Sequence, residues 1–189
     1  FGDVSDFEAM GEMVRKLEAE HGPIGILVNC AGITRDSTFR KMTPEQWQLV
    51  IDTNLTSVFN VTKHVIDSMC ERGWGRVVNI SSVNGVRGQF GQTNYSAAKA
   101  GILGFTKALA QEVIRKGVTV NAVSPGYVET EMVAAIREDV KQQIVAQIPA
   151  GRLGRPEEIA ETIAYLCSEQ AAYVTGANLS VNGGLHMYA

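Results

Sequence analysis

Short apolar segments alternate with long segments of helical periodicity, and this alternation limits the fold more than any other feature. Four runs have the composition of buried strands: Gly25–Asn29, Arg76–Ile80, Val118–Val123 and Leu179–Val181. Helical spacing predicts helices over 5–21, 44–72, 95–115, 130–147 and 156–168. Strands that alternate with helices pair in parallel through right-handed crossovers. The sequence therefore predicts an α/β fold, a doubly wound parallel sheet with helices on both faces.

Length and composition favour one ordinary globular domain over residues 1–189. Hydrophobic residues make up 45% and charged residues 20% of the 189 positions, which argues against a disordered chain. The net charge of -3 shows no basic bias toward nucleic acid, and no apolar run approaches the ~18 residues of a membrane span. Cys30, Cys70 and Cys167 lie far apart, so we expect neither disulfides nor a metal site, and a cytoplasmic location.

Glycine and polar residues follow three of the predicted strands. They are Asn29-Cys30-Ala31-Gly32, Ser81-Ser82 and Pro125-Gly126. Ligands of doubly wound sheets bind beyond the carboxyl ends of the strands. We therefore expect these residues to gather at one edge and to form the site.

A Tyr-x-x-x-Lys pair, Tyr95 and Lys99, provides the chemistry. Residues four apart share one face of a helix, and a nearby ammonium lowers the pKa of a phenol toward neutral pH. Ser82, at a strand's carboxyl end, could hold a substrate oxygen beside that phenol, and Asn54 could serve a water or backbone relay. Spacing alone also fits a surface Tyr beside a surface Lys, and a helical Asn with no special role.

Several motifs in the right order resemble the short-chain dehydrogenase/reductase family along the whole chain. They are Asn29-Cys30-Ala31-Gly32, the helical Asn54, the set Ser82, Tyr95 and Lys99, the turn Pro125-Gly126 with Thr130, Thr175-Gly176, and Asn182-Gly183-Gly184. The resemblance implies a Rossmann-type fold and an oxidoreductase that uses NADP(H). It implies that Tyr95 donates a proton, that Lys99 lowers the pKa of Tyr95 and binds the nicotinamide ribose, that Ser82 orients the carbonyl, and that Asn54 carries a water.

The same resemblance implies the residues around the cofactor. In addition to Tyr95 and Lys99, they are Gly2, Asp3, Val4, Asn29, Cys30, Ala31, Gly32, Ile33, Pro125, Gly126, Val128 and Thr130. Cys30 departs from the family, which has a second Asn at that place, and the lost amide is expected to weaken cross-bonding in the sheet or the adenosine pocket.

The family's glycine-rich phosphate loop does not occur in this sequence. Gly85, Gly88 and Gly91 have a different spacing with no helix start of the required kind, so we interpret them as a mobile substrate loop. The N-terminal strands are accordingly expected to be missing, the strand at Ile26–Asn29 to be an exposed apolar edge, and the chain to be part of a longer protein. An inactive fragment, or a non-catalytic binding protein on the same fold, stays an alternative.

Two branches of the family share the most local sequence with this chain, and both reduce 3-oxoacyl thioesters with NADPH. Similarity around Asn79–Tyr95 favours acetoacetyl-CoA over a carrier-protein thioester. By that resemblance the acyl-CoA site comprises Asp36, Ser82, Gln89, Phe90, Gly91, Gln92, Tyr127 and Arg137. The sequence alone favours a solvated helix face for Arg137. The resemblance further implies a homotetramer formed through the helices 44–72 and 95–115 and the C-terminal strand.

Overall fold

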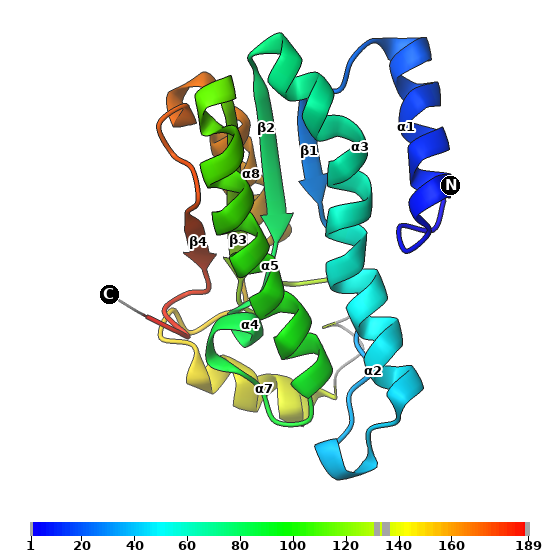
Figure 1. The fold of residues 1–189 in the computed structure, drawn as a ribbon. Coiled ribbons are helices and arrows are strands. Elements are labelled where there is room, and N and C mark those ends of the chain that lie inside the picture. Colours follow the sequence, from blue (N-terminus) through cyan, green and yellow to red (C-terminus); the bar gives the residue numbers. More distant parts are fainter. Residues whose placement is uncertain (1, 131–132, 134–136, 188–189) are drawn as a thin grey trace.

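A parallel four-stranded sheet forms the centre of the molecule in a computed structural model, which describes residues 2–130, 133 and 137–187 (Figure 1). The strands are β1 (Ile26–Asn29), β2 (Gly75–Ile80), β3 (Val118–Pro125) and β4 (Asn178–Val181), in the spatial order β1-β2-β3-β4. All three pairings are parallel, with Leu27 beside Val77 and Val77 beside Val120. The predicted α/β class and the four strands are confirmed.

Helices cover both faces of the sheet. The helices α1 (Phe7–His21), α3 (Ser57–Arg72) and α5 (Thr93–Val113) lie on one side, and α8 (Pro156–Cys167) lies on the other (Figure 1). Neighbouring residues of β2 point to opposite faces, so Val77 joins the core under α3 and α5 while Val78 joins Leu166 of α8. This alternation produces two core layers, which a doubly wound sheet requires.

The helix predicted over 44–72 is not continuous. It consists of α2 (Pro44–Ile51), a π-helical turn η2 (Asp52–Thr56) and α3. Thr43 caps the start of α2, because its hydroxyl accepts from the Gln46 backbone N–H while the Gln46 side chain accepts from the Thr43 N–H. A π-helical turn inside an α-helix is common at functional sites, and this one contains Asn54.

The segment of Gly85, Gly88 and Gly91, which we expected to be a mobile loop, contains a short helix, α4 (Val83–Arg87). Gly85 lies within it, where an added Cβ would sit 2.7 Å from Lys99 Cβ. Gly85 therefore allows α4 to pack directly on α5. This ordered helix differs from the wholly mobile loop that we expected there.

The remaining helical elements are short or partly described. They are η1 (Phe39–Lys41), η3 (Ile114–Lys116), α7 (Glu138–Gln147) and η4 (Glu169–Ala171). The helix predicted over 130–147 is confirmed for α7, whereas residues 131–132 and 134–136 of that prediction lie outside the described residues. Within the part of the chain that the structure describes, no helix is both long and apolar enough to cross a membrane.

The edge of the sheet at β1 exposes apolar side chains. Ile26 and Val28 are 47% and 37% exposed, and among the described residues β1 pairs with β2 alone. The predicted exposed apolar edge is thus observed, in contrast to β2 and β3, which are buried.

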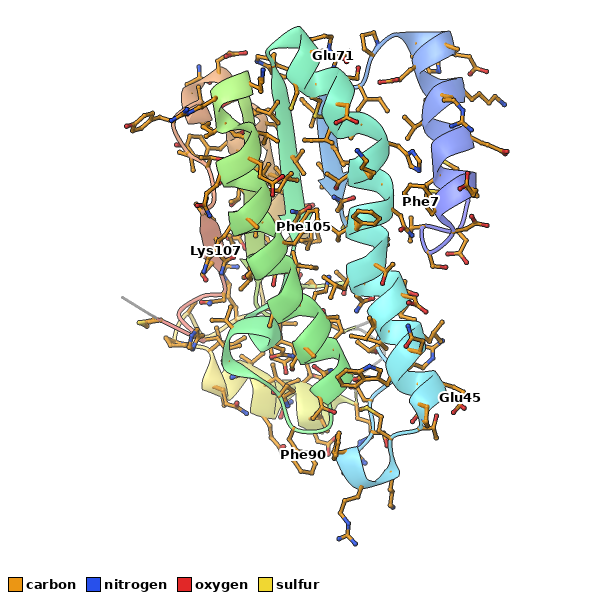
Figure 2. All side chains as sticks on the ribbon, in the orientation of Figure 1. Phe7, Glu45, Glu71, Phe90, Phe105 and Lys107 are labelled. Carbon is orange, nitrogen blue, oxygen red and sulfur yellow. The ribbon has the colours of Figure 1, made fainter. Side chains whose placement is uncertain are left out.

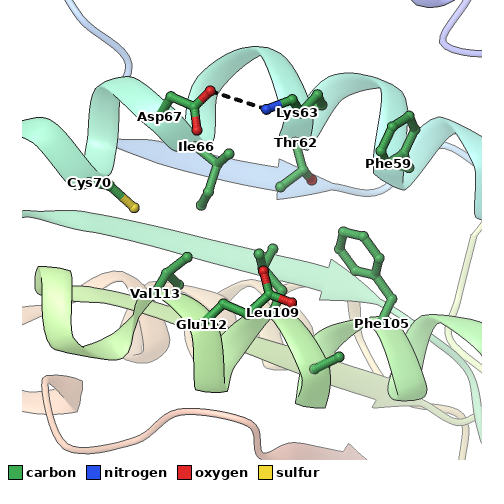
Figure 3. A pocket seen from close by; sticks show the side chains of 11 residues that line it. Phe59, Thr62, Lys63, Ile66, Asp67, Cys70, Phe105, Leu109, Glu112 and Val113 are labelled. Carbon is green, nitrogen blue, oxygen red and sulfur yellow. Dashed lines mark hydrogen bonds and ion pairs between the residues drawn. The ribbon is translucent and has the colours of Figure 1, made fainter.

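A hollow of about 330 Å³ lies between α3 and α5 on the outer surface (Figure 3). Phe59 and Ile66 of α3 face Phe105 and Leu109 of α5 across it. Charged groups lie at its border, among them Lys63, whose Nζ is 3.1 Å from Asp67 Oδ2.

Candidate active site

A cavity of about 900 Å³ lies beyond the carboxyl ends of β1, β2 and β3. Thirteen of the residues expected to bind cofactor or substrate line it: Cys30, Gly32, Ile33, Asp36, Ser82, Gln92, Tyr95, Lys99, Pro125, Gly126, Tyr127, Val128 and Thr130. The expected convergence of three strand ends is therefore observed. The groups come from segments distant in sequence, which the parallel sheet brings together at one edge.

Lys99 is almost completely buried at the inner end of this cleft. Its side chain is 3% exposed, and Nζ donates a hydrogen bond of 2.7 Å to the Ile80 carbonyl, at the end of β2. Burial lowers the pKa of Lys99 to about 8, an effect that nearby Cys30 partly opposes. The Nζ atom is 5.7 Å from the centre of the Tyr95 ring, as the four-residue spacing on one helix predicts.

The pKa of Tyr95 lies above its ordinary value, which is opposite to the sequence-based expectation. Burial of the phenol causes most of this rise, and a hydrogen bond with Ser82 acts against it. Asp36 and Cys30 raise the pKa further through their charge. The expected influence of Lys99 is weak here because desolvation dominates at this site and also lowers the proton affinity of Lys99 itself.

Ser82 begins α4 and lies at the carboxyl end of β2. Its Oγ accepts a hydrogen bond of 3.1 Å from the Asn84 backbone N–H, so the hydroxyl proton is free to point toward the cleft. The preceding Ser81 donates from Oγ to the Lys99 carbonyl at 2.8 Å. These two serines join β2 and α4 to α5 next to Tyr95.

Asn54 positions the loop after β1 rather than pointing into the cavity. Its Nδ2 donates to the Ile33 carbonyl at 2.9 Å, and its Oδ1 accepts from the Ile33 N–H at 2.8 Å. Gly32 lies against this pair, where an added Cβ would be 3.4 Å from both Asn54 Oδ1 and Lys99 Nζ. Both ends of the side-chain amide thus bind the Ile33 backbone.

Asn29 is turned into the sheet and is not part of the cavity wall. Its Nδ2 donates to Asn79 Oδ1 at 2.8 Å and to Thr62 Oγ1 at 3.1 Å, and Asn79 in turn donates to Thr106 Oγ1 at 3.0 Å. Cross-bonding of the sheet is thus present although Cys30 replaces an Asn. Cys30 itself is exposed and lines the cavity, whereas Ala31 is exposed and does not.

The segment after β3 lines the opposite wall with Pro125, Gly126, Val128 and Thr130. Gly126 permits a close approach to the C-terminal strand, since an added Cβ would be 2.9 Å from Asn182 Cα. Gly126 and Gly32 line the cavity together with Lys99, whose ammonium can donate hydrogen bonds to a ribose hydroxyl. The residues present therefore fit the nicotinamide half of a dinucleotide.

The residues expected beside the adenine, Gly2, Asp3 and Val4, are not among those that line the cavity. They form the entry to α1, where Asp3 Oδ1 accepts from the Ser5 N–H and hydroxyl. Buried Asn60 donates to the Val4 carbonyl at 3.1 Å and fixes this turn to α3.

Substrate residues expected from the resemblance divide into two groups. Asp36, Ser82, Gln92 and Tyr127 line the cavity. The other group does not: Phe90 is 87% exposed and projects from its loop (Figure 2), and Arg137 pairs with Asp139 at 3.2 Å in solvent. Gln89 and Gly91 also lie outside the cavity wall, where Gln89 accepts from Arg87 and the Gly91 carbonyl accepts from Ser37.

Sequence reasoning missed part of the wall. Ile159, Ala160 and Ile163 of α8 form an apolar side of the cavity, and Thr34, Val83 and Asn84 also line it. The spacing of Ile159 and Ile163 signals an inward helix face without indicating a site. Among the missed residues, Asn84 was the easiest to predict from the sequence, because it lies only two residues after Ser82.

Known proteins similar to this chain identify its family. A family model described as Enoyl-(Acyl carrier protein) reductase matches residues 2–186. The chain is 64% identical to Nodulation protein G of Azospirillum brasilense, 63% to Acetoacetyl-CoA reductase of Cupriavidus necator, and 49% to 3-oxoacyl-(acyl-carrier-protein) reductase FabG of Escherichia coli. Each match covers 98% of this chain and 75–76% of the relative. With a parallel sheet, a cleft at its carboxyl edge and these relatives, the chain belongs to the short-chain dehydrogenase/reductase family of oxidoreductases.

Proposed function

We propose that this chain reduces acetoacetyl-CoA to (R)-3-hydroxybutanoyl-CoA with NADPH, in the cytoplasm, as a step of polyhydroxybutyrate synthesis. The observation that carries the proposal is the meeting of Ser82, Tyr95 and buried Lys99 at the inner end of one cleft. Five relatives named acetoacetyl-CoA reductase, 58–63% identical over nearly the whole chain, support the substrate.

The chain's own residues supply the proton and the orientation. The Ser82 hydroxyl donates a hydrogen bond to the 3-oxo group and holds it beside the Tyr95 phenol, which donates a proton to the same oxygen. The raised pKa of Tyr95 keeps the phenol protonated before the reaction, which suits the direction of reduction. Lys99, anchored on the Ile80 carbonyl, has further N–H groups that can bind a ribose hydroxyl.

Reduced nicotinamide supplies the hydride when it is bound. Gly32, Ile33, Val128 and Thr130 would hold its ring and carboxamide, and Lys99 its ribose. The preference for NADP(H) over NAD(H) rests on the resemblance to reductases of this family, and a comparison of the two cofactors in the assay below tests it.

Reduction of a carrier-protein thioester is the second candidate. The 49% identity to the E. coli FabG reductase supports it, as do the exposed cations Arg35, Arg40 and Lys41 in the segment that follows β1, because a carrier protein is acidic. Arg87 contributes less to this basic group, since its guanidinium donates to Asn84 and Gln89.

Side-by-side kinetics with acetoacetyl-CoA and with a long-chain 3-oxoacyl carrier-protein thioester test the substrate. Oxidation of NADPH is followed by its absorbance, with NADH as the comparison cofactor. We expect a higher kcat/KM for acetoacetyl-CoA. An equal or higher value for the carrier-protein thioester would refute the preferred substrate and support the second candidate.

Replacement of Tyr95 by Phe tests the mechanism. The variant keeps the ring and removes only the hydroxyl, so we expect turnover to fall by at least ~10³-fold while the melting temperature changes little. Unchanged turnover in Tyr95→Phe would eliminate the phenol as the proton donor. Tyr173→Phe, which removes the same hydroxyl from a fully exposed ring, serves as the control.

We further propose that copies of the chain associate as a homotetramer through α3, α5 and the C-terminal strand. The hollow between α3 and α5 and the half-exposed Phe59 are an apolar surface that a second copy's helices would cover (Figure 3). Native mass spectrometry measures the assembly, and Phe59→Glu should dissociate it. A monomeric wild-type protein would contradict the proposal.

A further inference from the structure

Four side chains form a hydrogen-bonded row along one wall of the cleft. Arg87 Nε donates to Asn84 Oδ1 at 3.4 Å, Asn84 Nδ2 donates to Gln92 Oε1 at 3.1 Å, and Gln92 Nε2 donates to Asp36 Oδ2 at 2.8 Å. The row begins on α4, crosses the start of α5 and ends on the loop after β1. It therefore joins three segments of the chain, and its members Asn84, Gln92 and Asp36 line the cavity.

The two ends of the row fix the direction of every hydrogen bond in it. A guanidinium can only donate, and a carboxylate can only accept. Gln92 must therefore turn its NH₂ group toward Asp36 and its oxygen toward Asn84, and Asn84 must turn its own oxygen toward Arg87. The charges at both ends strengthen this polarity, because charge-assisted hydrogen bonds are stronger than neutral ones.

Asn84 is the member that transmits this polarity. It is 7% exposed, and both ends of its amide are used within the row. Its backbone N–H binds Ser82 Oγ, so the same residue fixes both the Ser82 hydroxyl of the reaction site and the amide of Gln92. A second link, from the Ser37 N–H to the Gly91 carbonyl at 2.9 Å, holds the two loops together independently.

We infer that Asn84 is a positioning residue which makes Gln92 a hydrogen-bond donor toward the acyl substrate. Gln92 lines the cavity, and the second N–H of its Nε2 has no partner among the residues that the structure describes. That N–H suits an acceptor oxygen, such as the carbonyl of a thioester or of an amide in the arm attached to it. The inference rests on the proposed function and specifies which chemical group of a 3-oxoacyl thioester meets Gln92.

Reversal of the row provides the test. In Asn84→Asp the new carboxylate can only accept hydrogen bonds. The Gln92 amide must then either keep its oxygen against this carboxylate, or flip and turn its oxygen against the Asp36 carboxylate. We expect the KM for acetoacetyl-CoA to rise about 10-fold, the loss of one neutral hydrogen bond, with little change in the KM for NADPH or in kcat. An unchanged KM for acetoacetyl-CoA would overturn the inference.

The double variant Asn84→Asp with Asp36→Asn separates orientation from structural support. The amide introduced at position 36 can donate to Gln92 Oε1, while Gln92 Nε2 donates to the carboxylate introduced at position 84, so the row is complete but runs backwards. We expect the melting temperature to return to the wild-type value and the KM to stay raised, since Gln92 then offers an acceptor to the substrate. Recovery of the KM together with the melting temperature would show that only continuity of the row matters, and would overturn the inference.

Two further variants complete the experiment. In Gln92→Glu the side chain keeps nearly the same shape but its carboxylate cannot donate a hydrogen bond, so we expect the same rise in the KM for acetoacetyl-CoA. An unchanged KM in this variant would contradict the role of Gln92 as a donor, even if the double variant does not fold. Gln111→Glu adds an equal charge to the exposed side of α5 and should leave the KM unaltered. Lack of wild-type turnover with acetoacetyl-CoA would count against the proposed function instead.

Discussion

Replacement of Gly85 by Ala should damage the active site far more than the stability of the fold. The added Cβ would lie 2.7 Å from Lys99 Cβ and 2.8 Å from the Lys99 carbonyl carbon, and ordinary contact begins at 3.4 Å. Because one of these atoms is backbone, α4 must move away from α5 by about 0.7 Å, the difference between 2.7 and 3.4 Å. That movement separates Ser82, at the start of α4, from Tyr95 and Lys99.

The magnitudes differ for the two properties. Overpacking costs about 1–3 kcal/mol, but Ala is better than Gly in a helix by about 1 kcal/mol, so the net loss in the free energy of unfolding is about 0–2 kcal/mol. A misplacement approaching 1 Å in an active site costs about 10²-fold in rate, so we expect kcat to fall about 100-fold.

Steady-state kinetics and thermal unfolding of Gly85→Ala measure both quantities. Gly104→Ala on α5 is the matched control, because an added Cβ there meets no atom within 4 Å, and we expect full activity and slightly higher stability. Wild-type kcat in Gly85→Ala would refute the argument that close packing of α4 on α5 sets the geometry of Ser82.

Two further predictions concern pH. The pKa of Lys99 is about 8 in the folded chain and near 10.5 when exposed, so the unfolded state binds more protons between these two pH values. The free energy of unfolding should therefore rise from pH 8 to pH 10.5 by up to about 3 kcal/mol relative to Lys99→Met. The same pH dependence of the free energy of unfolding in both proteins would contradict this prediction. Hydrogen bonds from Arg152 and the Arg155 N–H lower the pKa of Glu158 to about 2, so the stabilisation by this pair is present above pH 4.5 and is lost as the pH falls toward 2. The difference in melting temperature between the wild type and Arg152→Met should therefore vanish over that range, and a difference independent of pH would count against the pairing.

Much of the fold follows from local sequence. Val118–Val123 and Arg76–Ile80 are apolar runs between turn residues, and the Thr43–Gln46 cap marks the start of a helix by its chemistry alone. The π-helical turn at Asp52–Thr56 could not be predicted from local sequence. It contains Asn54, whose side chain hydrogen-bonds the backbone of Ile33, a residue 21 positions away in the sequence.

The membership of the site was predictable only in part, and its geometry was not. Phe90 and Arg137 were expected in the site and do not line the cavity, whereas Ile159 and Ile163 line it and were missed. Ser82, Tyr95 and Lys99 meet because strand ends and helix periodicity bring them together. The direction of the Asn29 amide, into the sheet, depends on Asn79 and Thr62, which sequence does not place beside it. The raised pKa of Tyr95 likewise depends on burial, which only the packed structure reveals.

The hydrogen bond between Asn79 and Thr106 has a consequence for how this site can change. Thr106 lies eleven residues after Tyr95 on α5, which is three full turns of the helix plus roughly 20°. Tyr95, Lys99 and Thr106 therefore lie on the same side of the helix. Ile102 and Ala110 on the same side belong to the protein's interior. The angular setting of α5 about its own axis is therefore determined by the interior and by one threonine. A variant that aims to shift the phenol of Tyr95 must repack the centre of the protein.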